Sequence, residues 1–140
     1  MKVRMLCMCI SLMLMGQVFA AVEIELEVIK QIESSGDPLA FNARSGARGL
    51  YQITKICLKD FNQRNNDSYT MAEMYNPVKN EAVARWYIYK RIPQMLNYYD
   101  IPITVDSVLW AYNAGIGRVI KGELPSETVE YIRRYKRRVR

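Results

Sequence analysis

Hydrophobic residues recur every three or four positions in several segments of the chain, which is the spacing that gathers them on one face of an α-helix. The first such segment runs from Ile24 to Ser34, and Gly36 and Pro38 supply a stop directly after it. The next apolar series predicts a second helix and consists of Leu50, Ile53, Cys57 and Phe61.

A third helix is marked by its opening. Asn76 can cap the free N–H groups of a helix end, and Pro77 suits the first helical position. Pro93 should end this helix, because proline lacks the N–H that the helix needs. Its apolar face is predicted to hold Val78, Ala82, Trp86 and Tyr89.

Two further helices complete the pattern. Thr104 is a candidate cap for the fourth, which should stop where Gly115 and Gly117 interrupt the apolar series. The fifth is expected to begin near Pro125 and to run into a basic tail. The aromatic side chains of these helices are expected to pack mainly in the core, and the largest of them are Trp86, Trp110 and Tyr112.

These elements predict one all-α domain over residues 21–140, with at most minimal β content. Residues 1–20 are set apart, because Lys2 and Arg4 precede an apolar run that ends in a small-x-small pattern at Ala20. We interpret this segment as a cleaved secretory signal peptide and expect a periplasmic or extracellular protein. An uncleaved membrane anchor is the weaker alternative, since the apolar run is shorter than the ~20 residues of a spanning helix.

The amino-acid composition excludes several kinds of catalytic site. The chain has no histidine, which excludes Ser-His-Asp and Cys-His catalysis and most catalytic zinc sites. No metal or cofactor is expected. Cys57 is the only cysteine after Ala20 and is expected to be a buried apolar filler.

Positive charge is concentrated at the C-terminus. The formal net charge is +6, and six of the last ten residues are lysine or arginine. A basic tail suits an anionic wall polymer or a membrane surface. A nucleic-acid partner is not expected, because export would separate the protein from it.

Glu33 is the candidate catalytic acid. It lies in the last turn of the first predicted helix, beside the apolar stripe and before a loop that could border a cleft. Burial and the negative end of the helix dipole would both raise the pKa of this carboxyl. A carboxyl group with a raised pKa can protonate the oxygen of a glycosidic bond near neutral pH.

Four short motifs follow one another from Glu33 onward. They are Glu33-Ser34, then Gly49-Leu50-Tyr51-Gln52, then Ala111-Tyr112-Asn113-Ala114-Gly115, and finally Glu127-Thr128 with Tyr131. This ordered series resembles the soluble lytic transglycosylase family, which shares the lysozyme-like fold with goose-type lysozymes. The motifs extend over most of residues 21–140.

The resemblance implies a role for each motif. Glu33 would be the single acid and base, Ser34 would help to position it, and Tyr131 would lie near its carboxyl group. Glu127 would be chiefly structural. Residues implied to bind the sugar chain are Leu50, Tyr51, Gln52, Asn113 and Ala114.

The chain departs from the family pattern in two places. Position 51 is tyrosine where methionine is usual, and the loop over residues 38–46 is one residue longer. The usual loop serine is therefore displaced, and either Asn42 or Ser45 could take its place against substrate.

The resemblance implies cleavage of the bond between N-acetylmuramic acid and N-acetylglucosamine in peptidoglycan, with closure of a 1,6-anhydro ring and no consumption of water. One alternative is a hydrolase of the same fold, in which Asp37, Asp106 or Glu130 activates water. Another is a non-catalytic wall-binding or assembly protein. The small single-domain form resembles transglycosylases that open the wall locally, so components of a secretion or conjugation apparatus are candidate partners.

Overall fold

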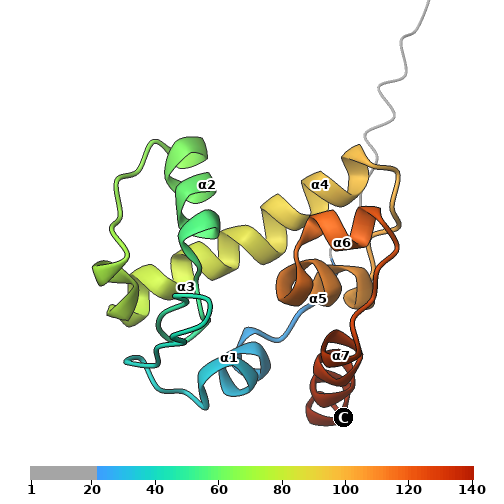
Figure 1. The fold of residues 1–140 in the computed structure, drawn as a ribbon, viewed down its shortest axis with the longest axis horizontal. Coiled ribbons are helices and arrows are strands. Elements are labelled where there is room, and N and C mark those ends of the chain that lie inside the picture. Colours follow the sequence, from blue (N-terminus) through green and yellow to red (C-terminus); the bar gives the residue numbers. More distant parts are fainter. Residues whose placement is uncertain (1–21) are drawn as a thin grey trace, which may run out of the picture.

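The computed structural model describes residues 22–140, and the predicted signal peptide at residues 1–20 lies outside them. The described part is built from helices, as predicted (Figure 1). In chain order the elements are α1 (Leu26–Ser34), α2 (Lys55–Asn65), the 3-10 turn η1 (Ala72–Tyr75), α3 (Pro77–Trp86), the π-helical η2 (Tyr87–Arg91), α4 (Ile92–Tyr98), α5 (Val105–Ala114), α6 (Ile116–Ile120) and α7 (Ser126–Arg138).

A long rod formed by α3, η2 and α4 crosses the molecule (Figure 1). It opens as predicted, with the Asn76 side chain accepting bonds from two backbone N–H groups and Pro77 in the first turn. The prediction that Pro93 ends the helix is wrong. Pro93 lies in the first turn of α4, directly after the π-helical turn, where a wider turn accommodates the missing N–H.

The buried face of α3 also differs from the prediction. Val78 is 78% exposed, and Ala82 is exposed as well. The helix instead buries the face that carries Asn80, Val83 and Ala84. An apolar pattern cannot select this face correctly, because its N-terminal member is a fully buried asparagine.

Helix α2 begins later than predicted. Thr54 caps it by accepting a hydrogen bond from the N–H of Cys57, so Leu50 and Ile53 lie before the helix. Gly49 and Gln52 have positive φ values of 77° and 50°, which a right-handed helix does not allow. Two isolated bridges, Phe41 with Arg48 and Arg48 with Ile53, are the β pairing in this loop.

Helix α5 has the predicted start. Thr104 and Ser107 form a capping box, and Gly115 ends the helix with a φ of 84°. Gly117 was predicted to be part of the same stop, but it lies inside the short helix α6. The turn at Gly115 folds α6 back beside α5.

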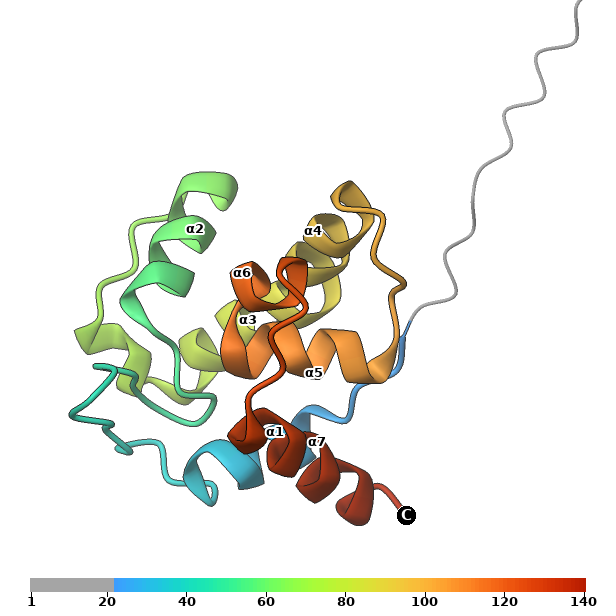
Figure 2. The same cartoon turned by 45° about the vertical axis from the view of Figure 1, so that its right-hand side comes forward.

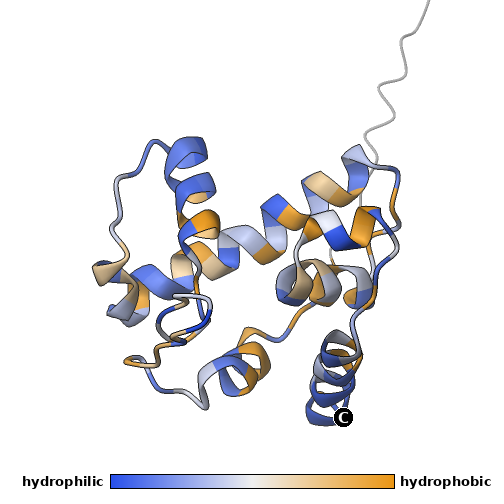
Figure 3. Cartoon of the chain, in the orientation of Figure 1, coloured by the Kyte–Doolittle hydropathy of each residue, from blue (hydrophilic) through white to orange (hydrophobic). Residues whose placement is uncertain are grey.

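Helices α1 and α7 lie side by side, although they come from opposite ends of the described chain (Figure 2). The Tyr135 hydroxyl accepts a 2.8 Å hydrogen bond from the N–H of Glu25 and ties the start of α1 to α7. Figure 3 shows that α7 is hydrophilic over most of its outer surface, while Thr128, Tyr131 and Tyr135 form its buried face. Within residues 22–140, no helix is long and apolar enough to cross a membrane.

Candidate active site

Glu33 lies in the last turn of α1, where the helix stops at a left-handed Ser35 with a φ of 56°. The neighbouring Ser34 does not bond to Glu33. Its hydroxyl donates a 2.8 Å hydrogen bond to the carbonyl oxygen of Leu50. Ser34 thus fixes the end of α1 against the loop before α2, and it orients Glu33 only through the backbone.

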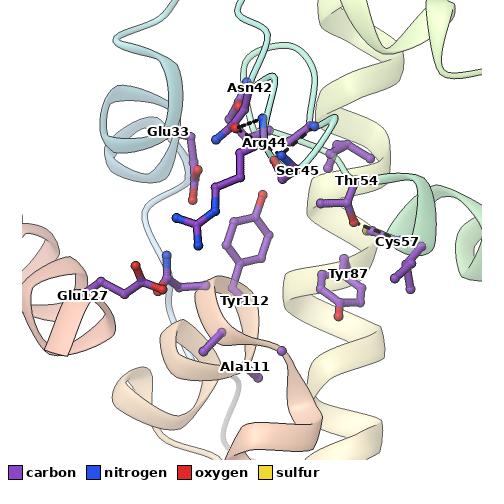
Figure 4. A pocket seen from close by; sticks show the side chains of 17 residues that line it. Glu33, Asn42, Arg44, Ser45, Thr54, Cys57, Tyr87, Ala111, Tyr112 and Glu127 are labelled. Carbon is purple, nitrogen blue, oxygen red and sulfur yellow. Dashed lines mark hydrogen bonds between the residues drawn. The ribbon is translucent and has the colours of Figure 1, made fainter. Parts of the chain in front are cut away.

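The Glu33 carboxylate faces a cavity of about 630 Å³ between α1, α2, α5 and the loop over residues 42–47 (Figure 4). α7 contributes one residue to its wall. The lining residues include Glu33, Asn42, Arg44, Ser45, Gln52, Ile56, Tyr87, Tyr112, Asn113, Ala114 and Glu127. Both carboxylates and amides are present, so the wall can donate and accept hydrogen bonds.

The carboxyl group of Glu33 is held largely out of water. Burial raises its pKa from 4.5 to about 7, because desolvation disfavours the charged form. A hydrogen bond from Tyr131 and the charge of Arg134 act in the opposite direction, but their combined effect is smaller. The group can therefore hold a proton near neutral pH and release it within the same range.

Two tyrosines surround this carboxyl group. Tyr131 donates a 2.8 Å hydrogen bond to its Oε1 atom, so the residue lies near this carboxyl group, as the family resemblance implies. Tyr112 lines the cavity, and its hydroxyl donates to the Tyr51 carbonyl oxygen at 2.6 Å. Burial raises the pKa of both phenols well above 10, so they stay protonated.

Gln52 is held firmly at the cavity wall. Its Nε2 atom donates to the carbonyl oxygens of Gly49, at 3.0 Å, and Ala40, at 3.3 Å. Its φ of 50° is unusual for a residue other than glycine. With both amide protons engaged, Oε1 is the polar atom that Gln52 can offer to a ligand.

Leu50 and Tyr51 do not line the cavity with their side chains, in contrast to the groove position expected for them. Both are buried in the core, with exposed fractions of 8% and 2%. The positive φ values on either side turn these two residues inward. Their backbone carbonyls serve the site instead, by accepting bonds from Ser34 and Tyr112.

The buried Asn80 holds this turn from behind, a role that sequence reasoning missed. It accepts a bond from the N–H of Tyr51 at 2.9 Å and donates to the carbonyl oxygens of Arg48 and Met74 at 2.9 and 2.8 Å. Asn80 lies inside an amphipathic helix, four positions after Asn76. A single polar residue at such a position gives too weak a signal to be identified from one sequence.

The loop over residues 42–46 brings both candidate serine replacements to the cavity. The Asn42 side chain accepts bonds from the backbone N–H groups of Arg44 and Ser45 and so closes the loop. Ser45 accepts a weaker bond from the Ala47 N–H. Between them, the Arg44 side chain extends into the cavity beside Glu33 and Tyr112 (Figure 4). Arg44 was not among the predicted site residues.

Glu127 also lines the cavity, on the side opposite the loop over residues 42–46 (Figure 4). The other acidic candidates lie elsewhere. Asp106 pairs with Lys136, Glu130 pairs with Arg133 and Arg137, and Asp37 caps its own loop through the Leu39 N–H. Glu127 is therefore a better placed second carboxylate than the three named from sequence.

The buried Cys57 fits its expected role as a filler. Its side chain is almost fully buried on α2, and burial raises the pKa of the thiol to about 12. A thiol that stays protonated is a poor nucleophile. Among residues 22–140, no cluster of three or more acidic or cysteine side chains could hold a metal ion.

The two tryptophans pack as expected. Trp86 lies partly buried and edge-on to Phe61, with ring centroids 5.3 Å apart. Trp110 packs against the core and donates its indole N–H to the Glu123 carbonyl oxygen. Neither ring lines the cavity.

Comparisons with known proteins agree with the motifs. A family model described as the transglycosylase SLT domain matches residues 16–132. Searches of curated proteins and of solved structures found no significant match. The family match extends over most of the chain, from the end of the predicted leader through Tyr131. The chain belongs to the transglycosylase SLT domain family, whose substrate is peptidoglycan.

Proposed function

We propose that this protein is a lytic transglycosylase that cleaves the β-1,4 bond between N-acetylmuramic acid and N-acetylglucosamine, with Glu33 as its single acid and base. The observation that carries the proposal is a carboxyl group with a pKa of about 7 on the wall of a 630 Å³ cavity. Family membership supplies the substrate class.

The reaction needs two proton transfers by one group. Protonated Glu33 donates its proton to the bridging oxygen as the bond from that oxygen to the muramyl C1 breaks. The resulting carboxylate then takes the proton from the muramyl 6-hydroxyl, whose oxygen bonds to C1 and closes the 1,6-anhydro ring. Glu33 returns to its protonated form, and no water is consumed. A pKa near neutrality suits both steps.

The polar wall of the cavity supports this proposal. Tyr131 holds one carboxylate oxygen of Glu33, which leaves the other free to face the sugar chain. Gln52 and Asn113 provide amide groups on the cavity wall. The non-catalytic alternative gives no reason for a carboxyl group to be desolvated at the edge of a polar cavity.

The test is cleavage of purified peptidoglycan by wild type and by Glu33→Gln. Removal of a general acid costs about 10²–10⁴-fold in rate, so we expect soluble glycan release to fall by at least 100-fold while the variant stays folded, as thermal unfolding shows. Glu23→Gln is the matched control, because Glu23 lies outside the cavity. Equal activity in Glu33→Gln would eliminate the proposal.

A hydrolase remains the second candidate, because Glu127 lines the same cavity as Glu33. In that case Glu127 would activate a water molecule, and Glu127→Gln would lose activity as severely as Glu33→Gln. A transglycosylase needs no second carboxylate, so we expect Glu127→Gln to retain at least a tenth of wild-type activity.

We further propose that the protein is exported and opens the wall locally, for example for a secretion or conjugation apparatus. The charged start, apolar run and small-x-small end of residues 1–20 support export. The basic last turns of α7 would suit an anionic wall polymer or membrane surface. Mass measurement of the protein recovered from the cell envelope tests this, because cleavage after Ala20 predicts a chain that begins at Ala21.

A further inference from the structure

Thr128 is a fully buried polar residue next to the cavity. It lies on α7, and its hydroxyl is 2.7 Å from the Oδ1 atom of Asn113, at the end of α5. Asn113 lines the cavity, whereas Thr128 does not. A buried hydroxyl on one helix therefore contacts an exposed amide on another, with only the amide open to a ligand.

The chemistry of the pair fixes the direction of the bond. An amide oxygen only accepts, so the threonine hydroxyl donates its single proton to Oδ1. The Nδ2 atom of Asn113 then points away from Thr128, and it donates no hydrogen bond within the described part of the chain. Asn113 thus presents two unused N–H donors at the cavity wall.

Gln52 is oriented the opposite way. Both of its amide protons are used by backbone carbonyls, so its oxygen is the atom left for a ligand. The cavity wall consequently offers one fixed amide donor and one fixed amide acceptor. An N-acetyl group carries a carbonyl oxygen, which can accept a hydrogen bond from an amide N–H such as that of Asn113.

We propose that Thr128 is a positioning residue that holds Asn113 with its amide nitrogen toward the cavity, where it donates to the carbonyl oxygen of an N-acetyl group on the sugar chain. The inference rests on the proposed function for its ligand class. It adds the atom that makes the contact and the residue that orients it. Loss of the Thr128 hydroxyl would let the Asn113 amide rotate. Its Oδ1 atom would then face the carbonyl oxygen of the N-acetyl group, and two acceptors cannot form a hydrogen bond.

Binding of a β-1,4-linked N-acetylglucosamine oligomer, measured by calorimetry in the Glu33→Gln protein, tests this without turnover. One hydrogen bond contributes about 1 kcal/mol, or several-fold in affinity. We expect Thr128→Val to weaken binding about 5- to 10-fold and Asn113→Ala to do the same. Thr128→Ser keeps the hydroxyl and should bind within 2-fold of the parent.

The double variant that combines Thr128→Val with Asn113→Ala shows whether Thr128 acts through Asn113. If Thr128 acts through Asn113, Thr128→Val should weaken binding no further once Asn113 is alanine. The inference would be overturned if the losses of affinity from the two single substitutions multiplied in the double variant. It would also be overturned if Thr128→Ser bound the oligomer as weakly as Thr128→Val. The melting temperature is recorded for each variant, and Thr128→Ala replaces Thr128→Val if valine prevents folding.

The two proposals fail in different ways. A wild-type protein that does not cleave peptidoglycan, together with a Glu33→Gln parent that does not bind the oligomer, would reject the proposed function together with this inference. A parent that binds, beside a Thr128→Val variant that binds equally well, would reject the inference alone.

Discussion

The hydroxyl of Tyr131 on α7 donates a 2.8 Å hydrogen bond to Oε1 of Glu33 on α1, across 98 positions of sequence. This contact joins the two ends of the described chain at the candidate catalytic carboxyl. The bond favours the ionised form of Glu33 and so lowers the pKa that burial has raised.

Tyr131→Phe should therefore raise the pKa of Glu33 above its value of about 7. If the protonated carboxyl is the active acid, the fall in kcat/KM at high pH will shift to higher pH in this variant. The pH profile of peptidoglycan cleavage measures the shift. An unchanged or lower midpoint would show that Tyr131 does not act on the carboxyl that protonates substrate.

Arg134 offers a second way to move the same pKa. Its positive charge favours ionised Glu33 and lowers the pKa of that carboxyl, so Arg134→Gln should move the midpoint upward. The matched control is Arg133→Gln, because Arg133 pairs with Glu130 and does not contribute to the pKa of Glu33. Equal shifts in the two variants would point to net charge rather than to proximity.

The contribution of Glu33 to stability should fall as the pH rises from 4.5 to about 7. The pKa of Glu33 is about 7 in the folded protein and 4.5 when exposed, so the folded state holds this proton more tightly. The stabilisation is complete below pH 4.5 and is lost as the pH passes the folded value. The difference corresponds to at most about 3 kcal/mol.

Glu33→Gln cannot ionise, so it should keep its stability over that range. Denaturant unfolding at pH 5 and pH 8 measures the two proteins side by side, and other titrating groups cancel in the comparison. We expect the variant to gain on wild type by 1–3 kcal/mol at the higher pH. A constant difference between the two would mean that Glu33 ionises at its ordinary pKa.

Gly49 is predicted to tolerate no side chain. An added Cβ atom would lie 2.1 Å from the Met74 carbonyl oxygen and 2.4 Å from Nδ2 of Asn80. Gly49→Ala should cost more than about 3 kcal/mol in the free energy of unfolding.

Gly46→Ala is the matched control, because Gly46 also has a positive φ but has open space around it. Its cost should be only the ~1 kcal/mol of a left-handed alanine. Thermal unfolding of the two variants compares these costs. Equal destabilisation would contradict the close approach at Gly49.

Sequence predicted the elements whose signals are local. The Asn76-Pro77 opening, the cap at Thr104 and the stop at Gly115 depend on residues within one helical turn, and all three are confirmed. The placement of Glu33 in the last turn of α1 is also confirmed.

The errors arose where tertiary contacts or an irregular helical turn override a local pattern. Leu50 and Ile53 have helical spacing with Cys57, but Asn80 binds the backbone of Tyr51 and holds this stretch as a turn. Pro93 is a helix breaker by local rules, yet the preceding π-helical turn lets the rod continue. The long-range approach of α7 to α1 likewise has no local signal.

In the proposed reaction Glu33 acts as acid and then base, with no second carboxylate and no water. The most direct measurement is the mass of the sugar ends that purified protein releases from peptidoglycan, with Glu33→Gln as the inactive control. We predict muramyl ends one water lighter than reducing ends, as a 1,6-anhydro ring requires. Exclusively reducing ends from the wild-type protein would contradict the transglycosylase mechanism and favour hydrolysis with Glu127 as the base.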